Sequence, residues 1–314
     1  MSGVVRAPRG IDVAVVVVTF NSAPHLDGLL SSLDAATGGL RIRLVAVDNA
    51  SADGTVARLE DDGRAEVLVQ PGNRGYAAGV NVALAATRDA PAVLVLNPDV
   101  SLAPGSVPAL LVPGRDPGVG IVVPQIRAPS GAVHRSLRRE PTVGRALGTA
   151  IVGGRIAGRF PMLSETVGDG RSYRVRRDVD WATGAAMLVT RRCVDATGPW
   201  DESFFLYSEE TDFAERARRG GFRVVYEPAA VVTHVGGDCM TSPRLRSMLV
   251  VNRLRYFRRR HGPLRSGAFY LALLGNELTR GALGNRAARA ASRALVSVRA
   301  RPPELCCSDR LLPR

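Results

Sequence analysis

The feature that most constrains this fold is a series of apolar runs, each of which ends in polar residues. The first run, residues 11–20, is rich in valine with little alternation, which is typical of a strand buried on both faces of a parallel sheet. Strands are expected over 11–20, 41–48, 66–70 and 92–97. Helices are expected over 24–36, 51–60 (capped by Ser51) and 76–87. Alternating strands and helices with short links predict a doubly wound α/β sheet.

The second half of the chain is less regular. Residues 125–178 are rich in glycine, proline and arginine, which predicts loops and short helices over the sheet, with a mobile lid as one interpretation. Beyond them we expect a strand over 179–190 led by Trp181, a helix over 209–219, and two short strands over 222–226 and 230–234.

Polar side chains follow three of the expected strands at the point where each strand ends. They are Thr19 and Asn21, then Asp48 and Asn49, then Asn97 and Asp99. A turn or a helix cap explains any one of them alone. Because ligands bind at the carboxyl ends of the strands in such sheets, the three pairs together predict a shared polar crevice.

Three further features could carry chemistry. Asp99 follows a hydrophobic strand, where a carboxylate can meet a divalent metal and a diphosphate. Glu209 and Glu210 follow the apolar residues 204–207, and desolvation there would raise a carboxyl pKa toward that of a general base. Acids at a helix N-terminus also stabilise the helix, so a structural role stays open. His234 is either a metal ligand or a buried histidine.

Seven segments in order carry a family resemblance. They are VVVVTFN (15–21), VAVDNASADGT (45–55), GNRGYAAGVN (72–81), LVLNPDV (94–100), VDWATGAAMLVTRR (179–192), GPWDESFFLYSEETDFAERARRGGFRVVYEPAAVVTHVGG (198–237) and NRLRYFRRRHG (252–262). Each is only moderately specific. Taken together, over residues 11–262, they resemble family 2 glycosyltransferases with the GT-A fold, a Rossmann-like mostly parallel sheet, and in particular the bacterial rhamnosyltransferase-like branch.

The resemblance implies an inverting glycosyltransferase, which moves a sugar from a nucleotide diphosphate to an acceptor hydroxyl by a single displacement. It implies that Thr19 and Asn21 lie near the nucleotide. Asp48 matches the acid that accepts a hydrogen bond from the base, and Asn73 and Gly75 match the loop beside it.

The same resemblance implies a metal site and a base. Asp99 matches the last acid of the DxD metal motif and His234 a metal-contacting histidine, so Mg²⁺ or Mn²⁺ is the expected cofactor. Glu210 lies where the family carries its catalytic base. The acceptor-side segment is expected to contain Trp181, Gly184 and Ala185.

Three positions depart from the family pattern. Asn97, which we include in the nucleotide-sugar site, stands at the first DxD position and removes one charge there. Glu210 stands where aspartate is commoner, and the extra methylene shifts its carboxylate by about one carbon–carbon bond. Neighbouring Glu209 is therefore an alternative base. The stretch that follows His234 matches loosely.

The expected donor is a TDP- or UDP-sugar, with TDP-rhamnose first. The expected acceptor is a cell-envelope glycan or a polyprenyl-diphosphate-linked glycan. A nucleotidyltransferase that forms sugar nucleotides is the alternative, although no glycine-rich phosphate loop with a basic residue follows the first strand. A nucleic-acid-binding protein is a distant third interpretation, suggested by charge alone.

The net charge of +13 is unevenly distributed. Residues 1–100 contain 8 arginines against 11 acidic residues, whereas residues 236–314 contain 16 against 4, and the chain has no lysine. The motif-bearing first hundred residues are thus net acidic, so nucleic acid is not an expected partner. The arginine-rich stretch 253–260 and the helical pattern beyond it predict binding to an anionic membrane surface. A solvated charged helix is the alternative.

We expect a GT-A domain over residues 1–262, with a nucleotide-binding half at 11–100 and an acceptor half at 101–262. A basic amphipathic helical extension over 263–301 and a disordered tail over 302–314 would follow. The four cysteines fit no disulfide framework, and no apolar run is long enough to span a bilayer. We therefore expect a cytoplasmic protein, peripheral on the inner face of the bacterial membrane.

Overall fold

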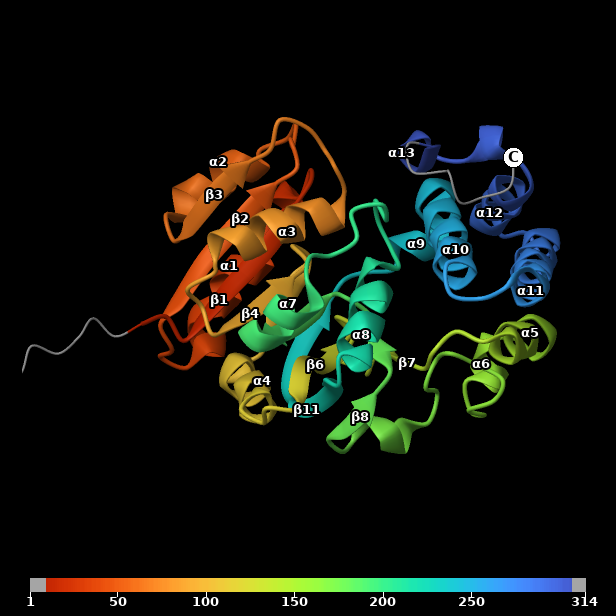
Figure 1. Ribbon diagram of the computed structural model, residues 1–314. Helices are drawn as coiled ribbons and strands as arrows, with labels where there is room; N and C mark the ends of the chain where they lie inside the picture. Colours follow the sequence, from red (N-terminus) through yellow and green to blue (C-terminus); the bar gives the residue numbers. More distant parts are fainter. Residues whose placement is uncertain (1–9, 307–314) are drawn as a thin grey trace, which may run out of the picture.

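A mixed nine-stranded sheet forms the centre of the computed structural model, which describes residues 10–306 (Figure 1). Its strands are β1 (Val13–Thr19), β2 (Ile42–Asp48), β3 (Ala65–Val69), β4 (Ala92–Leu96), β5 (Val100–Leu102), β6 (Val119–Arg127), β8 (Arg177–Val179), β10 (Ala186–Thr190) and β11 (Arg223–His234). Their order is β3-β2-β1-β4-β10-β6-β11-β5, and β8 pairs with β11. The strands β7 (Leu137–Arg138) and β9 (Trp181–Ala182) form a separate two-stranded sheet.

The direction of the strands confirms the expected mostly parallel α/β sheet. The strands β3, β2, β1 and β4 are parallel neighbours, and so are β6 and β11. β10 runs antiparallel to both β4 and β6, and β5 runs antiparallel to β11. In β1 every residue is buried, because helices cover both faces of the sheet.

Three helices pack on each face of the large sheet. The helices α1 (Ala23–Thr37), α2 (Thr55–Asp62) and α4 (Ser106–Gly114) bury their leucines and valines against one face. The helices α3 (Tyr76–Ala86), α7 (Arg191–Thr197) and α8 (Glu209–Arg219) cover the other face. Alternate residues of β1 belong to the two cores, so this valine run joins both layers.

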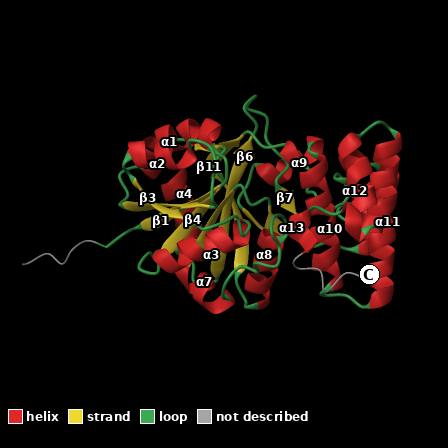
Figure 2. Cartoon of the chain, turned by 90° about the horizontal axis from the view of Figure 1, so that it is seen from above, coloured by secondary structure: helices red, strands yellow, loops and turns green. Residues whose placement is uncertain are grey.

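A third core lies beside the sheet (Figure 2). It is built from α5 (Val143–Val152), α10 (Pro243–Arg258), α11 (Pro263–Ala282) and α12 (Arg286–Val296). Phe257 and Phe269 stack at its centre with ring centroids 3.9 Å apart. The shorter elements are α6 (Gly154–Ala157), η1 (Gly170–Tyr173), α9 (Asp238–Thr241), η2 (Val298–Ala300) and α13 (Pro303–Cys306). Within residues 10–306, no helix combines the length and the apolar character needed to cross a membrane.

Several expected elements are corrected by the structure. The strand expected over 179–190 is divided among the end of β8, β9 and β10. The division arises because β9 pairs with β7, and Thr183 N donates to Ser136 O (3.0 Å) just before β7, whereas β10 pairs with β4 and β6. The two strands expected over 222–226 and 230–234 are one strand, β11, with a register shift between Glu227 and Val231. β6 was not foreseen, and its last residues, 125–127, lie in the region that we expected to form loops and short helices. Its Pro124 pairs with Glu227, directly at that register shift.

Two further expectations, the cap of α2 and the C-terminal tail, also change. Ser51 does not cap α2, which begins at Thr55 after Gly54, since Ser51 instead bonds to Asp48. Residues 303–306 of the tail that we expected to be disordered form α13, and residues 307–314 lie outside the described part of the chain. The division of the chain into domains stays a prediction.

The arginine-rich stretch 253–260 is not the free basic surface that we expected. Three of its side chains form ion pairs inside the protein: Arg253 with Glu165, Arg259 with Asp201, and Arg260 with Asp212 and Glu215. Arg255 is fully buried. Most of these charges therefore attach the C-terminal end of α10 to α8 and to the segments around residues 165 and 201, rather than facing solvent.

The contact between α3 and β1 predicts a measurable loss of stability for Gly79→Ala. A Cβ at Gly79 would lie 2.6 Å from Val18 Cγ1, and a β-branched side chain on a buried strand has little freedom to move away. Overpacking of this kind costs about 1–3 kcal/mol, which urea unfolding would detect. Gly28→Ala in α1 is the control, since nothing lies within 4 Å, and it should stabilise by roughly 0.5–1 kcal/mol. Equal or greater stability of Gly79→Ala would contradict this packing.

Candidate active site

The first part of the site is the turn after β2. Thr19 and Asp48 are paired in the β1–β2 register, and Thr19 Oγ1 donates to Asp48 Oδ1 at 2.8 Å. Ser51 donates its hydroxyl to the same oxygen (2.6 Å) and its backbone N–H to Oδ2 (2.8 Å). Asp48 is fully buried. Both of its oxygens thus accept hydrogen bonds from the chain, which fixes the turn at the carboxyl edge of the sheet.

Asn21 follows β1 and is hydrogen-bonded to the turn after β2. Its backbone N–H donates to Ser51 Oγ (2.8 Å), and its Oδ1 accepts from Ala52 N (2.9 Å). Its φ of 50° is left-handed, a conformation that asparagine adopts more easily than most residues. The structure therefore brings Thr19, Asn21 and Asp48 together, as the predicted nucleotide site requires.

The loop that follows β3 adds Asn73 and Gly75. Asn73 Oδ1 accepts from Gly75 N (2.9 Å), and Gly75 O accepts from Asn49 Nδ2 (3.1 Å). Asn49 Oδ1 is buried and has no hydrogen-bond partner within the described chain. Sequence reasoning noted Asn49 only as a polar strand end, and its position directly after Asp48 was the signal. A buried unpaired acceptor makes it an additional ligand-binding candidate.

Gly75 also lets the loop after β3 contact the segment that precedes α8. A Cβ there would come within 2.4 Å of Phe205 O, and its φ of 93° is left-handed, so only glycine fits without movement. The next residue, Tyr76, donates its backbone N–H to the same Phe205 oxygen at 2.8 Å. The loop beside the predicted nucleotide site thus lies directly against the segment that leads into α8.

The second part of the site lies beyond β4. Asn97 N donates to Ala185 O at 2.9 Å. Asp99 Oδ2 lies 3.1 Å from His234 Nε2 and accepts from Gly236 N, also at 3.1 Å. A Cβ at Gly236 would fall 2.7 Å from the His234 ring, so the glycine makes room for the imidazole. The structure therefore brings the two predicted metal ligands together.

The surroundings of Asp99 favour its charged form. Burial alone would raise its pKa, but the hydrogen bond and charge of His234, together with the Gly236 N–H, lower the pKa below its ordinary value. Among residues 10–306 no cluster of three or more His, Cys, Asp or Glu side chains could hold a metal. One carboxylate and one imidazole fit Mg²⁺ or Mn²⁺ when phosphate oxygens complete the coordination.

The third part is the pair of glutamates that opens α8. Glu209 is buried, and its Oε2 has no hydrogen bond within the described residues. Burial, and then the charge of Glu210, raise the pKa of Glu209 well above its ordinary value. Burial also raises the pKa of Glu210, whereas hydrogen bonds from backbone N–H groups and the positive charge of Arg138 lower it in part. Both acids are therefore poised to hold a proton, Glu209 more strongly.

The backbone before these acids is strained. Tyr207 and Ser208 both adopt left-handed conformations, with φ of 72° and 76°. For residues other than glycine each such conformation costs of order 1 kcal/mol and persists where the surroundings impose it, commonly at functional sites. Here it turns the chain from the Phe205 contact into the first turn of α8.

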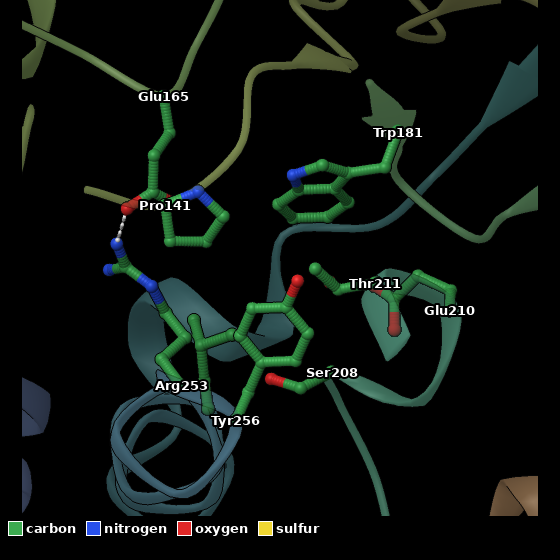
Figure 3. Close-up of a pocket in the computed structure, with 9 residues that line it drawn as sticks. Pro141, Glu165, Trp181, Ser208, Glu210, Thr211, Arg253 and Tyr256 are labelled. Carbon is green, nitrogen blue, oxygen red and sulfur yellow. Dashed lines mark hydrogen bonds and ion pairs between the residues drawn. The ribbon is translucent and has the colours of Figure 1, made fainter. Parts of the chain in front are cut away.

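The acceptor-side residues predicted from the sequence lie against Glu210. Trp181, Glu210 and Tyr256 line a cavity of about 40 Å³ (Figure 3), which has room for water but not for a sugar ring. Trp181 Nε1 donates to Arg139 O at 3.1 Å. A Cβ at Gly184 would lie 3.4 Å from Glu210 Cβ and Cγ, so the backbone there passes directly beside Glu210. Ala185 is buried and bonded to Asn97, as described above.

Sequence reasoning missed Tyr76. Its phenol oxygen is buried and has no hydrogen bond within the described residues. Burial raises the pKa of Tyr76, and the negative charges of Glu209, Glu210 and Asp99 raise it further. The phenol is thus electrostatically coupled to acids from both sides of the site. Its place in the GNRGY segment was the available signal.

The site thus combines the hydrogen-bonded loops after β1, β2 and β3, the Asp99–His234 pair, and two glutamates at the start of α8. The family model described as Glycosyl transferase family 2 matches residues 14–181. The chain is 34% identical over 232 residues to N-acetylglucosaminyl-diphospho-decaprenol L-rhamnosyltransferase of Mycobacterium tuberculosis, an alignment that covers 70% of this chain and 75% of the relative. The chain therefore belongs to glycosyl transferase family 2, in its rhamnosyltransferase-like branch.

Solved structures confirm the fold. A mannosyltransferase from Pyrobaculum calidifontis, in complex with GDP-Man and Mn²⁺, superposes with a TM-score of 0.52 at 16% identity over 96% of this chain and 87% of that chain. S. aureus TarS in complex with UDP-GlcNAc gives 0.51 at 16% identity, over 95% and 88%. At this level of identity the likeness establishes the architecture alone.

The buried Glu209 predicts a pH-dependent stability. Since its pKa is raised in the folded protein, the folded state holds a proton that the unfolded state releases above the ordinary pKa of 4.5. The free energy of unfolding should therefore fall as the pH rises from 4.5 to the folded pKa, and stay lower above it. Glu209→Gln should reduce this fall and raise stability above that window, measured by urea unfolding across the pH range.

Glu60→Gln is the matched control, because Glu60 is exposed and its removal should leave the pH profile unchanged. Parallel pH profiles of the wild type and Glu209→Gln would show that Glu209 is not a buried, proton-holding acid.

Proposed function

We propose that this family 2 glycosyltransferase transfers a sugar from a nucleotide diphosphate to a hydroxyl of a polyprenyl-diphosphate-linked or cell-envelope glycan, with inversion. The observation that carries the proposal is that Asp99, which is paired with His234, and the acids Glu209 and Glu210 all raise the pKa of the same buried phenol, that of Tyr76. TDP-rhamnose is the donor we put first, and a UDP-sugar is the alternative. The name of the mycobacterial relative supports both rhamnose and a polyprenyl-linked acceptor.

The nucleotide would bind at the carboxyl ends of β1 and β2. Thr19 and Asn21 at the end of β1 are hydrogen-bonded to Asp48 and to the turn that follows it, and Asn73 and Gly75 form the adjoining loop. Since both Asp48 oxygens already accept hydrogen bonds, a base N–H would share one of them. The unpaired Asn49 Oδ1 is a second acceptor for the same base.

The diphosphate would lie at the end of β4. Asp99 and His234 are the residues that would hold Mg²⁺ or Mn²⁺, and such an ion neutralises the charge that develops on the leaving diphosphate. Asn97, in place of an acid, leaves this site with a single protein carboxylate. Its side-chain amide is then available to a phosphate or sugar oxygen rather than to the metal.

Glu210 is the general base in this proposal. It removes the proton of the acceptor hydroxyl as that oxygen bonds to the anomeric carbon, while the bond from that carbon to the diphosphate breaks. Glu210 is half-buried and lines a cavity with Trp181, whereas Glu209 is buried and its pKa is raised further. Glu210 can therefore reach an acceptor beside Trp181, Gly184 and Ala185, and Glu209 is the less suitable base.

Membership of family 2 leaves the nucleotidyltransferase and nucleic-acid alternatives without an observation in their favour.

We also propose that the enzyme works at the inner face of a bacterial cell membrane. The support for this is a surface formed by α5, α6 and α11, which lie side by side (Figure 1).

That surface combines exposed apolar side chains with uncompensated arginines. Ile151, Met162, Leu264 and Leu271 are 79%, 78%, 91% and 64% exposed. Residues 141–164 include three arginines and no acid, and Glu277, the one acid within residues 263–301, is buried and paired with Arg246. Apolar residues among cations suit an anionic bilayer. A second copy of the chain would bring the same charge and be repelled.

Glu210→Gln tests the chemistry. With the base removed, transfer should fall by a factor of about 10²–10⁴, while nucleotide affinity stays near the wild-type value. Release of nucleotide diphosphate from a panel of TDP-, UDP- and GDP-sugars, with Mg²⁺ or Mn²⁺ and a polyprenyl-linked acceptor, is the measurement. Full activity of Glu210→Gln would remove this residue from the base role.

Two matched variants separate binding from chemistry. Glu209→Gln should keep most of the transfer activity, and a loss equal to that of Glu210→Gln would make Glu209 an equal candidate. Asp99→Asn should lose the metal-dependent part of donor binding. Unchanged metal dependence in Asp99→Asn would refute its assignment as a ligand.

Binding to vesicles tests the membrane surface. The double variant Ile151→Ser/Met162→Ser should bind phosphatidylglycerol-containing vesicles at least about tenfold more weakly, since burying one such side chain is worth about 1.5–3 kcal/mol. Val112→Ser on α4, where the valine is 49% exposed, is the control. Equal sedimentation of all three proteins with vesicles would reject this surface.

A further inference from the structure

A second and larger cavity lies next to the catalytic site. It has a volume of about 410 Å³, within the range of small-molecule sites. Its polar lining consists of Gln125, Arg127, Arg135, Tyr173 and Arg174. Neither the predicted site residues nor the proposed chemistry uses any of these side chains.

The charge of this cavity is uncompensated. No carboxylate lines it, and within residues 10–306 none of its three arginines forms an ion pair. Nearby arginines behave differently, since Arg176 pairs with Glu227 and Arg253 with Glu165. The three arginines are exposed and line one hollow, so their like charges create a positive potential there that favours an anionic ligand.

A buried polar framework orients one of these arginines. Gln125 is only 7% exposed, and its Nε2 donates to Tyr173 O (3.1 Å) and Tyr226 Oη (3.2 Å). Its Oε1 accepts from Arg127 Nε at 2.8 Å. The two terminal nitrogens of Arg127 have no hydrogen bond within the described chain. They form the fork that binds phosphate oxygens in pairs.

The strand register relates two of the cavity's arginines to the known parts of the site. Arg127 of β6 pairs with Thr233 of β11, and the next residue of β11 is His234. On the other side, Arg135 lies three residues before Arg138, which pairs with Trp181 across β7 and β9. Arg127 and Arg135 therefore belong to the strand pair that ends in His234 and to the segment that leads into β7, the partner of Trp181.

We propose that this arginine cavity binds the diphosphate group of the acceptor substrate. The inference rests on the proposed function, in which the donor diphosphate occupies the Asp99–His234 site. A second, separate site for a diphosphate is required only if the acceptor also carries one. The cavity has room for more than a diphosphate, so a sugar attached to that group could extend toward Glu210.

Calorimetric titration of the full chain with farnesyl diphosphate, below its micelle concentration, tests this inference without requiring activity. The wild type should bind it, and Arg127→Gln, Arg135→Gln and Arg174→Gln should each weaken binding by about tenfold or more. The affinity for UDP in the presence of Mn²⁺ should stay unchanged. Arg88→Gln, which removes an exposed arginine outside the cavity, is the matched control and should bind both ligands normally.

Three outcomes would overturn the inference. The first is wild-type affinity for farnesyl diphosphate in all three cavity variants. The second is an equal loss of farnesyl diphosphate and UDP binding, which would assign the cavity to the donor. The third is loss of binding to phosphatidylglycerol vesicles alone, which would assign it to lipid headgroups. Three separate substitutions keep the test informative if one of them impairs folding.

Hydrolysis of nucleotide sugars by the same wild-type preparation tests the proposed function separately. Sugar transfer without farnesyl diphosphate binding would reject the arginine cavity and keep the transferase. Binding through Arg127 without hydrolysis or transfer of any sugar in the panel would support the cavity and reject the proposed chemistry.

Discussion

The backbone contact between Gly75–Tyr76 and Phe205 is the constraint on which the site depends. Two loops more than a hundred residues apart meet where Tyr76 N donates to Phe205 O at 2.8 Å, and the absence of a Cβ at Gly75 allows the approach. On one side lies the hydrogen-bonded turn of Asp48. On the other side the chain passes through two left-handed residues into Glu209 and Glu210. This contact therefore fixes the position of the Asp48 turn relative to Glu209 and Glu210.

Ion pairs hold α8, the helix that begins with the two glutamates, in its place. Arg260 of the 253–260 stretch bonds to both Asp212 and Glu215 on α8. Tyr256 Oη donates to Glu140 Oε1 at 2.5 Å and lies 3.0 Å from Glu215 Oε2. Asp212 and Glu215 are themselves buried, so these contacts hold α8 against the rest of the protein. The burial that raises the pKa values of Glu209 and Glu210 depends on this packing.

The distribution of arginines explains what the net charge of +13 means for this protein. Part of the basic C-terminal quarter forms internal ion pairs, whereas α11 carries arginines in the same helix as exposed apolar residues. The uncompensated charge beside the active site comes instead from the middle of the chain, from Arg127, Arg135 and Arg174. A count of charges along the sequence could not separate these roles, because pairing depends on carboxylates from distant segments.

The sequence by itself determined the α/β class, the strands β1 to β4 and the helix α8, because long valine runs and helical spacing are local signals. It also pointed to Thr19, Asp48 and Asp99, as polar strand ends at one edge of a parallel sheet, whereas the roles expected for Glu210 and His234 came from the family resemblance. Only the tertiary structure decided that β10 inserts antiparallel between β4 and β6, that Glu209 is more buried than Glu210, and that the charges of Glu209, Glu210 and Asp99 act on Tyr76. Burial, register and charge pairing arise from contacts between distant segments, and no local pattern encodes them.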